Sequence, residues 1–220
     1  MTGRTLLFDL DGTLCDTDRL HFTAYQTLLA EFGRAITMQH YQARIMGQPN
    51  DAIMREMFPG LDAARHAALA DRKEQLFRAQ VSSLEPTPGL KTLLDWAETK
   101  GVPVAVVTNA PRPNAELMLQ GLGLTHRIDT LVLGEELPRA KPDPLPYSTA
   151  LERLGGVATR ALAFEDSIPG IQAASGAGVA TFAIRAGRSE SPLLAAGAIA
   201  AIDDFTDRRV WERLDALASA

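Results

Sequence analysis

The sequence predicts an α/β fold, with a parallel sheet and a block of helices inserted after the first strand. From residue 90 onward, short apolar runs with the composition of buried strands alternate with segments of helical periodicity. This alternation is typical of parallel strands joined by crossover helices. Between residues 18 and 85 the spacing is instead helical, and no strand is expected there. The helical block is therefore predicted to interrupt the sheet-forming part of the chain.

The first strand and the helical block come before residue 90. The apolar run Thr5–Phe8 is too short for a helix and suits a buried strand. After Asp18 the apolar residues recur at intervals of three and four, and Gly33 stands where the first helix is expected to end. Further helices are predicted near residues 38–45, 50–57 and 63–82, with breaks at Gly47-Gln48-Pro49 and Pro59-Gly60.

A third break, at residues 85–89, marks the return to the sheet. The helices predicted after it are 90–100, 114–122, 144–154, 170–177 and 210–217. The predicted strands are 103–108, 130–133, 161–165 and 180–184, and an Ala-rich run at 198–202 is a candidate edge strand. Residues 1–15 and 88–220 are thus expected to form a Rossmann-like core, and residues 16–87 a helical cap domain. The cap would lie over the carboxyl end of the first strand, where open α/β sheets bind ligands.

The composition excludes several classes of partner. With 46% hydrophobic residues, the 220-residue chain can build a core, and its net charge of -5 argues against a nucleic-acid or anionic-membrane surface. The single cysteine, Cys15, cannot form an internal disulfide, and no apolar run approaches the roughly 20 residues of a membrane span. We expect a cytoplasmic protein, a monomer or weak homodimer, that acts on a small solute.

Two carboxylates follow the first strand at the point where it ends. Asp9 and Asp11 are two residues apart, so along an extended backbone their side chains point to one side, and Gly12 permits a tight turn. Like charges held this close raise each other's pKa unless a cation joins them. The pair favours a metal ion, a proton shared between the acids, or a reaction that uses both; the alternative is an ordinary Asp-Gly turn with solvated acids.

Three later stretches are expected at the same edge of the sheet. The second predicted strand ends in Thr108 and Asn109, whose hydroxyl and amide suit a phosphate oxygen or, alternatively, a turn or helix cap. Lys141 precedes a Pro-Asp-Pro sequence that fixes the backbone, which places its ammonium at a defined point unless it is an ordinary surface lysine. Glu165 and Asp166 follow another strand, either as further site carboxylates or as capping residues.

Together, the four stretches resemble the motifs of the haloacid dehalogenase-like hydrolases. The resemblance is to the branch with a helical cap inserted after the first strand, which holds β-phosphoglucomutase, phosphoglycolate phosphatase and many sugar-phosphate phosphatases. It covers nearly the whole chain. The first motif is highly specific, the fourth moderately so, and the middle two are informative only in order and position. In chain order the motifs are Asp9-x-Asp11-Gly12-Thr13, Thr108-Asn109, Lys141-Pro142 and Glu165-Asp166-Ser167.

The resemblance implies a catalytic role for several of these residues. Asp9 would be the nucleophile that takes the phosphoryl group as an aspartyl-phosphate. Asp11 would protonate the leaving oxygen and then activate the water that hydrolyses the intermediate. Thr108, Asn109 and Lys141 would hold the transferring phosphoryl oxygens.

The resemblance also implies a magnesium site, formed by Glu165 and Asp166 with Asp9 and the backbone carbonyl of Asp11. Elementary electrostatics agrees, because four carboxylates facing a phosphate dianion require a dication and Lys141 supplies only one positive charge. An all-oxygen site, with no Cys or His at metal spacing, favours Mg²⁺.

The cap is expected to carry specificity. His21, Gly47 and Lys73 resemble substrate-binding positions of the β-phosphoglucomutase-like branch, although His21 and Lys73 could instead belong to a solvated helix face. The mutases carry an Arg three residues after the glycine, where this chain has Asn50. The second motif continues as Thr108-Asn109-Ala110, which resembles the form found in the phosphatases and not the Ser-rich form of the mutases.

We therefore expect a Mg²⁺-dependent phosphatase that hydrolyses a sugar phosphate or phosphoglycolate. The alternative enzyme is a β-phosphoglucomutase, which Asn50 counts against. The alternative outside the enzymes is a sensor that binds a phosphorylated ligand, and the presence of every catalytic position counts against it. Cys15 is expected to be a small packed residue and not a nucleophile.

Overall fold

The structure is a computed structural model that describes residues 3–46, 48 and 50–219, and it divides into two compact units. Met1–Asp16 and Leu84–Ala220 form the core unit, and Thr17–Ser83 form the helical unit. The interpretation of these units as a catalytic core and a cap stays a prediction.

The core unit is built on a six-stranded parallel sheet in the order β3-β2-β1-β4-β5-β6. Its strands are β1 Thr5–Phe8, β2 Val104–Thr108, β3 Thr130–Leu133, β4 Ala161–Glu165, β5 Ala180–Ile184 and β6 Ala200–Ile202. The first strand lies in the middle of the sheet, where Phe8 pairs with Val106 of β2 and Phe164 of β4. The predicted α/β fold with a Rossmann-like sheet is confirmed, and so is the candidate edge strand, which is β6.

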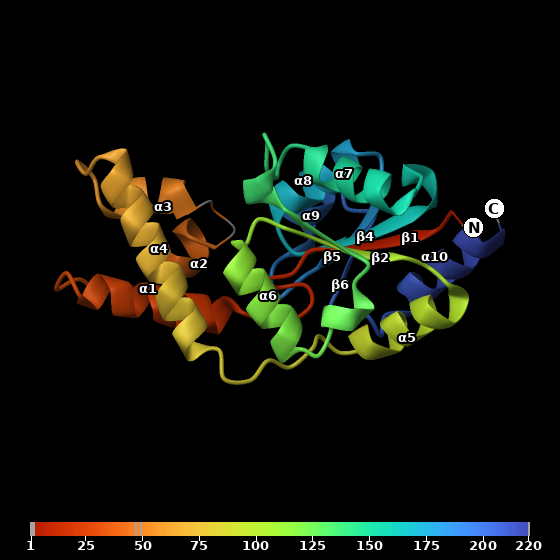
Figure 1. Cartoon of the computed structure of the whole chain (residues 1–220), viewed down its shortest axis with the longest axis horizontal. Helices are drawn as coiled ribbons and strands as arrows, with labels where there is room; N and C mark the ends of the chain where they lie inside the picture. Colours follow the sequence, from red (N-terminus) through yellow and green to blue (C-terminus); the bar gives the residue numbers. More distant parts are fainter. Residues whose placement is uncertain (1–2, 47, 49, 220) are drawn as a thin grey trace. The chain divides into compact units, whose positions relative to one another are not determined.

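Helices cover both faces of this sheet, with α7 and α8 on one face and α5 and α10 on the other (Figure 1). The helices of the core unit are α5 Leu90–Lys100, α6 Arg112–Gly121, α7 Leu145–Leu154, α8 Ile168–Gly176, α9 Glu190–Ala195 and α10 Arg208–Ser219. Short 3₁₀ turns occupy Thr125–Arg127, Gly134–Glu136 and Ala158–Arg160.

Strand periodicity decides which side chains reach which layer. Leu7 and Ala163 pack in the apolar cluster that includes residues of α7 and α8. Phe8 and Phe164, one residue further along each strand, point to the opposite face and stack at 5.1 Å between ring centres. Two residues beyond Leu7 and Ala163, the carboxylates of Asp9 and Glu165 are therefore directed to the face that α7 and α8 cover.

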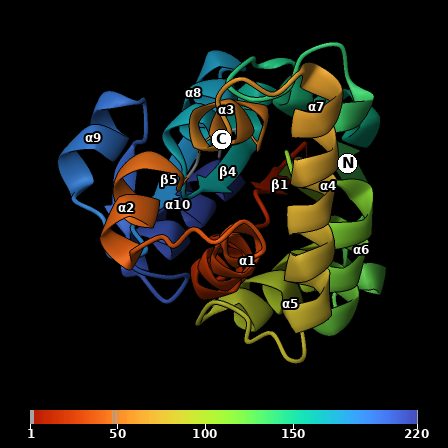
Figure 2. The same cartoon turned by 90° about the vertical axis from the view of Figure 1, so that its left-hand side faces the viewer.

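The helical unit consists of α1 Asp18–Ala30, α2 Met38–Arg44, α3 Asn50–Met57 and α4 Ala63–Gln80. The long helix α4 packs against α1 and α3 (Figure 2). Side chains of Thr37 and Asp62 accept backbone hydrogen bonds at the starts of α2 and α4, which explains where these helices begin. Apolar residues of α1, α2 and α3 form its core, with Met54 fully buried.

Element ends differ from the prediction by a few residues. Helix α6 begins at Arg112, because Pro111 before it is extended and proline is compatible with the first turn of a helix, where Pro113 lies. Helix α4 ends at Gln80 because Val81 is extended. The six residues of α9 are too few to show a helical period, so this helix was not predicted. In the described part of the chain, no helix combines the length and apolar character needed to cross a membrane.

Candidate active site

The first motif places Asp9 directly beyond the central strand. Its backbone N–H donates to the carbonyl of Phe164 in β4 at 2.9 Å, and its side chain is buried, so the carboxylate is fixed at the carboxyl edge of the sheet. Gly12 has φ 74°, and a Cβ on it would lie 2.4 Å from Asp166 Oδ2. A glycine is therefore required there by both the backbone and the neighbouring carboxylate. Asp11 is half-buried.

Lys141 joins the ends of β1 and β4. Its Nζ donates to Asp9 Oδ1 and to Glu165 Oε1, each at 2.6 Å, and the side chain is buried. Burial by itself lowers the pKa of Lys141, but the charges of Asp9 and Glu165 and their hydrogen bonds outweigh it, so that the pKa is raised. Lys141 therefore stays an ammonium group, and the surface-lysine alternative is wrong.

Glu165 is fully buried and accepts hydrogen bonds on both carboxylate oxygens. Oε1 accepts from Lys141 Nζ and from the hydroxyl of Tyr147 at 2.8 Å. Oε2 accepts from the backbone N–H groups of Asp166 and Ser167, at 3.2 and 3.3 Å, and from the Ser167 hydroxyl at 3.1 Å. These donors supply hydrogen bonds to both oxygens of a carboxylate that has no contact with solvent.

Asp166 is held by an arginine that the sequence motifs did not indicate. Arg188 Nη2 donates to Asp166 Oδ2 at 2.9 Å, and Arg188 Nη1 donates to the Asp166 backbone carbonyl. The turn before Arg188 has positive φ at Ala186 and Gly187, 45° and 78°. Only the folded chain brings this turn to the sheet edge, so no sequence signal could have found the contact.

The buried carboxylates fit a divalent cation. Asp9, Glu165 and Asp166 each offer an oxygen, and these oxygens lie within 4.8 Å of one another. Burial raises the pKa of Asp9, the charges of Glu165 and Asp166 raise it further, and Lys141 lowers it by less. Even with the half-buried Arg188 counted beside Lys141, the negative charges are in excess, and an all-oxygen donor set suits Mg²⁺.

Thr108 and Asn109 lie at the end of β2, next to this cluster in the sheet order. Thr108 is buried, and its Oγ1 accepts from the backbone N–H of Ala110 at 2.9 Å. The Asn109 side chain makes two hydrogen bonds to the backbone of Lys141, both at 3.3 Å. Its Nδ2 donates to the Lys141 carbonyl, and its Oδ1 accepts from the Lys141 N–H. Asn109 thus ties the loop after β2 to the Lys141 segment, and its contact with a phosphoryl group stays a prediction.

Within the helical unit, His21 and Lys73 contact each other. Lys73 is only 3% exposed, and its Nζ lies 2.7 Å from His21 Nδ1 and 2.9 Å from Glu74 Oε1. The solvated-face alternative is therefore wrong for Lys73. An ammonium group can only donate, so in this contact Nδ1 of His21 is the acceptor. The predicted cap residue Gly47 lies outside the described residues.

Glu74 and Asn50 complete this buried network. Asn50 Nδ2 donates to Glu74 Oε1 at 2.7 Å, and the Tyr25 hydroxyl donates to Asn50 Oδ1 at 3.1 Å. Burial raises the pKa of Glu74. The charges of Lys73 and His21, with hydrogen bonds from Lys73 and Asn50, lower it by more, so the net pKa is depressed. The network therefore contains an ion pair, and Asn50 is engaged within it.

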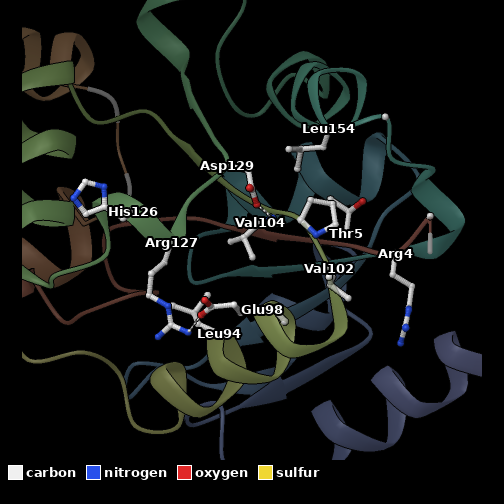
Figure 3. A pocket seen from close by; sticks show the side chains of 15 residues that line it. Arg4, Thr5, Leu94, Glu98, Val102, Val104, His126, Arg127, Asp129 and Leu154 are labelled. Atoms are coloured by element: carbon white, nitrogen blue, oxygen red, sulfur yellow. Dashed lines mark hydrogen bonds and ion pairs between the residues drawn. The ribbon is translucent and has the colours of Figure 1, made fainter. Parts of the chain in front are cut away.

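A separate pocket of about 500 Å³ lies at the amino ends of β1 and β2 (Figure 3). Its charged groups are largely satisfied by protein partners. Arg127 pairs with Glu98 and Asp95, and the Asp129 carboxylate accepts from the backbone N–H of Val104 at 2.8 Å. None of the predicted site residues lines this pocket, which is at the opposite end of the strands from Asp9.

The fold and the site define a Rossmann-like α/β protein with an acidic, cation-binding cluster at the carboxyl edge of its sheet. Residues 6–184 match the family described as haloacid dehalogenase-like hydrolase. The chain belongs to this family of hydrolases.

Relatives and solved structures agree with this assignment. The chain is 38% identical over 178 residues to a phosphoglycolate phosphatase of Xylella fastidiosa, an alignment covering 80% of this chain and 77% of the relative. It is 30% identical over 201 residues to a phosphorylated carbohydrates phosphatase of Thermotoga maritima, covering 90% and 93%. The crystal structure of CbbY from Rhodobacter sphaeroides in complex with phosphate superimposes with a TM-score of 0.84 at 26% identity, covering 96% and 99%.

The environment of Cys15 predicts an unreactive thiol. Cys15 is 1% exposed, and burial together with the charges of Asp11, Asp16 and Asp9 raises the pKa of its thiol well above the ordinary value. Iodoacetamide at pH 8 should therefore leave the native protein unmodified while labelling it fully in urea, as counted by intact mass. Rapid labelling of the folded protein would contradict a packed, protonated Cys15.

Proposed function

We propose that this hydrolase is a Mg²⁺-dependent phosphatase that releases phosphate from a small phosphorylated metabolite, a sugar phosphate or phosphoglycolate. Its class, phosphoric monoester hydrolase, follows from family membership together with relatives named as phosphatases. The observation that carries the proposal is the bridge that Lys141 makes between Asp9 and Glu165 within the carboxylate cluster.

Each residue of the cluster has a defined task in the proposed reaction. A carboxylate oxygen of Asp9 attacks phosphorus and the bond to the leaving oxygen breaks, while Asp11 gives that oxygen a proton. Asp11 then takes a proton from the water that attacks the aspartyl-phosphate, which frees phosphate and restores Asp9. Thr108 and Lys141 bind the phosphoryl oxygens, and the Lys141 charge stabilises the transition state.

The metal would be held by Asp9, Glu165, Asp166 and the backbone carbonyl of Asp11. Bound Mg²⁺ would neutralise the carboxylates and polarise the phosphate ester. Arg188 orients Asp166 through two hydrogen bonds, so that this carboxylate is presented in one conformation.

We further propose that His21, Gly47 and Lys73 of the helical unit contact the part of the substrate that does not react. The charge of Lys73 is already balanced by Glu74, and Asn50 is engaged with Glu74 and Tyr25. A second phosphate would need a cation to bind it, such as the Arg of the mutases. The network therefore favours hydrolysis of monophosphates over a mutase reaction. Cytoplasmic location and a monomer or weak homodimer stay predictions.

A panel of phosphorylated metabolites, assayed for phosphate release, tests the proposed function. We expect hydrolysis of a sugar phosphate or phosphoglycolate without any bisphosphate activator. With β-glucose 1-phosphate, phosphorus NMR should detect no efficient formation of glucose 6-phosphate, whether or not glucose 1,6-bisphosphate is added. Efficient isomerisation with little free phosphate would instead establish a mutase.

The same panel tests the helical unit. Lys73→Ala should reduce kcat/KM for the preferred substrate at least about tenfold more than for p-nitrophenyl phosphate, which gains little from contacts remote from its phosphate. Lys91→Ala, which removes an exposed lysine from α5, is the matched control and should change neither. Equal losses on both substrates would remove the proposed specificity role of Lys73.

Metal dependence follows from the excess of buried carboxylate charge. Excess chelator should abolish turnover and added Mg²⁺ should restore it, whereas Ca²⁺ should substitute poorly because its larger, looser coordination sphere misplaces Asp9. Asp166→Asn should weaken Mn²⁺ binding, measured by electron paramagnetic resonance without substrate, by at least about tenfold. Full activity in the chelator, or unchanged Mn²⁺ affinity in the variant, would disprove the metal site.

A further inference from the structure

Tyr147 contacts both groups that flank Asp9. It lies on α7, is fully buried, and packs in the apolar cluster between the sheet and the helices α7 and α8. Its hydroxyl donates to Glu165 Oε1 at 2.8 Å, and the Nζ of Lys141 lies 5.3 Å from the centre of its ring. One side chain therefore joins the apolar core to the charged cluster.

Packing alone does not account for the Tyr147 hydroxyl. A phenylalanine would fill the same apolar space, and a buried hydroxyl is tolerated only where it has a partner. That partner is the oxygen of Glu165 that also accepts from Lys141 at 2.6 Å. The other carboxylate oxygen is held by Asp166 and Ser167. Tyr147 and Lys141 are thus the two donors that fix the oxygen facing Asp9.

Lys141 needs this fixed anchor during the reaction. Two of its three N–H directions are used by Asp9 Oδ1 and Glu165 Oε1, and the ring of Tyr147 stabilises the ammonium by a cation–π contact. When Asp9 becomes phosphorylated, its carboxylate charge is replaced by that of the phosphoryl group, which leaves when the intermediate is hydrolysed. Glu165 is then the carboxylate that stays bound to Lys141 throughout the reaction. A Glu165 carboxylate free to turn would let the ammonium drift from the phosphoryl group.

We propose that Tyr147 is a positioning residue of phosphoryl transfer, which acts through Glu165 and Lys141 to keep the Lys141 ammonium against Asp9 and the transferring group. The inference rests on the proposed phosphatase function and adds a residue to which that mechanism gives no task.

Two substitutions separate the hydroxyl from the ring. Tyr147→Phe removes the hydrogen bond to Glu165 and keeps the ring, and should lower kcat for p-nitrophenyl phosphate about tenfold with KM changed less than about twofold. Tyr147→Leu also removes the cation–π contact and should lower kcat about a hundredfold. Tyr41→Phe is the matched control: its hydroxyl donates to Asp18 Oδ1 at 3.4 Å within the helical unit, and kcat should be unchanged.

A double-mutant cycle with Lys141→Met distinguishes positioning from a structural role. If Tyr147 acts through Lys141, Tyr147→Phe should change the residual turnover of the Lys141→Met protein less than about twofold. An equal fractional loss in both backgrounds, or an unchanged kcat in Tyr147→Phe alone with only a lower unfolding midpoint, would overturn the proposal.

Activity of the wild-type protein distinguishes a failure of the proposed phosphatase function from a failure of the proposed role of Tyr147. A wild type that releases no phosphate from any ester overturns the proposed function and this inference with it. An active wild type whose kcat survives Tyr147→Phe overturns the role of Tyr147 alone and leaves the phosphatase function intact.

Discussion

The active-site structure depends on one buried ammonium group shared by two carboxylates. Lys141 contacts Asp9 and Glu165 at 2.6 Å each, although Asp9 is 132 residues away in the sequence. Removing one partner of such a buried pair leaves an unpaired charge and typically costs about 3–5 kcal/mol. The surrounding residues serve this bridge: Asn109 holds the Lys141 backbone, Tyr147 holds Glu165, and Gly12 leaves room for Asp166. The parallel sheet makes the bridge possible because the carboxyl ends of β1 and β4 lie side by side.

The two units differ in how far their buried charges are balanced by protein partners. The core unit gathers more buried negative charge than its own cations neutralise, and a divalent cation could balance this excess. The helical unit instead balances its buried charge internally, because Lys73 is paired with Glu74 at 2.9 Å. The excess of buried negative charge and the internally balanced ion pair thus lie in separate units of the chain.

Short-range sequence patterns predicted much of the fold, and the predicted fold in turn indicated which residues gather at the carboxyl edge of the sheet. The strands are apolar runs bounded by polar residues, and parallel topology brings their carboxyl ends together, so that the acids and Lys141 were expected in one place. Tyr147 could not be identified, since an aromatic residue at helical spacing reads as ordinary core. Arg188 reaches Asp166 only through a positive-φ turn. The burial of Lys73 against Glu74 depends on the packing of α4, which a helix pattern does not specify. The roles of the helical-unit residues came from the family resemblance and stay predictions.

In the proposed mechanism, Asp9 is the nucleophile and forms a covalent phosphoryl intermediate. The direct test is acid quenching of the Asp11→Asn protein during turnover of p-nitrophenyl phosphate, followed by peptide mapping by mass spectrometry. This variant should accept the phosphoryl group from a good leaving group but should hydrolyse the intermediate slowly, because no base activates the water. We expect one phosphoryl group on Asp9, and none after the same treatment of the Asp9→Asn protein. A phosphoryl group on another residue, or an Asp9→Asn protein with substantial turnover, would contradict it.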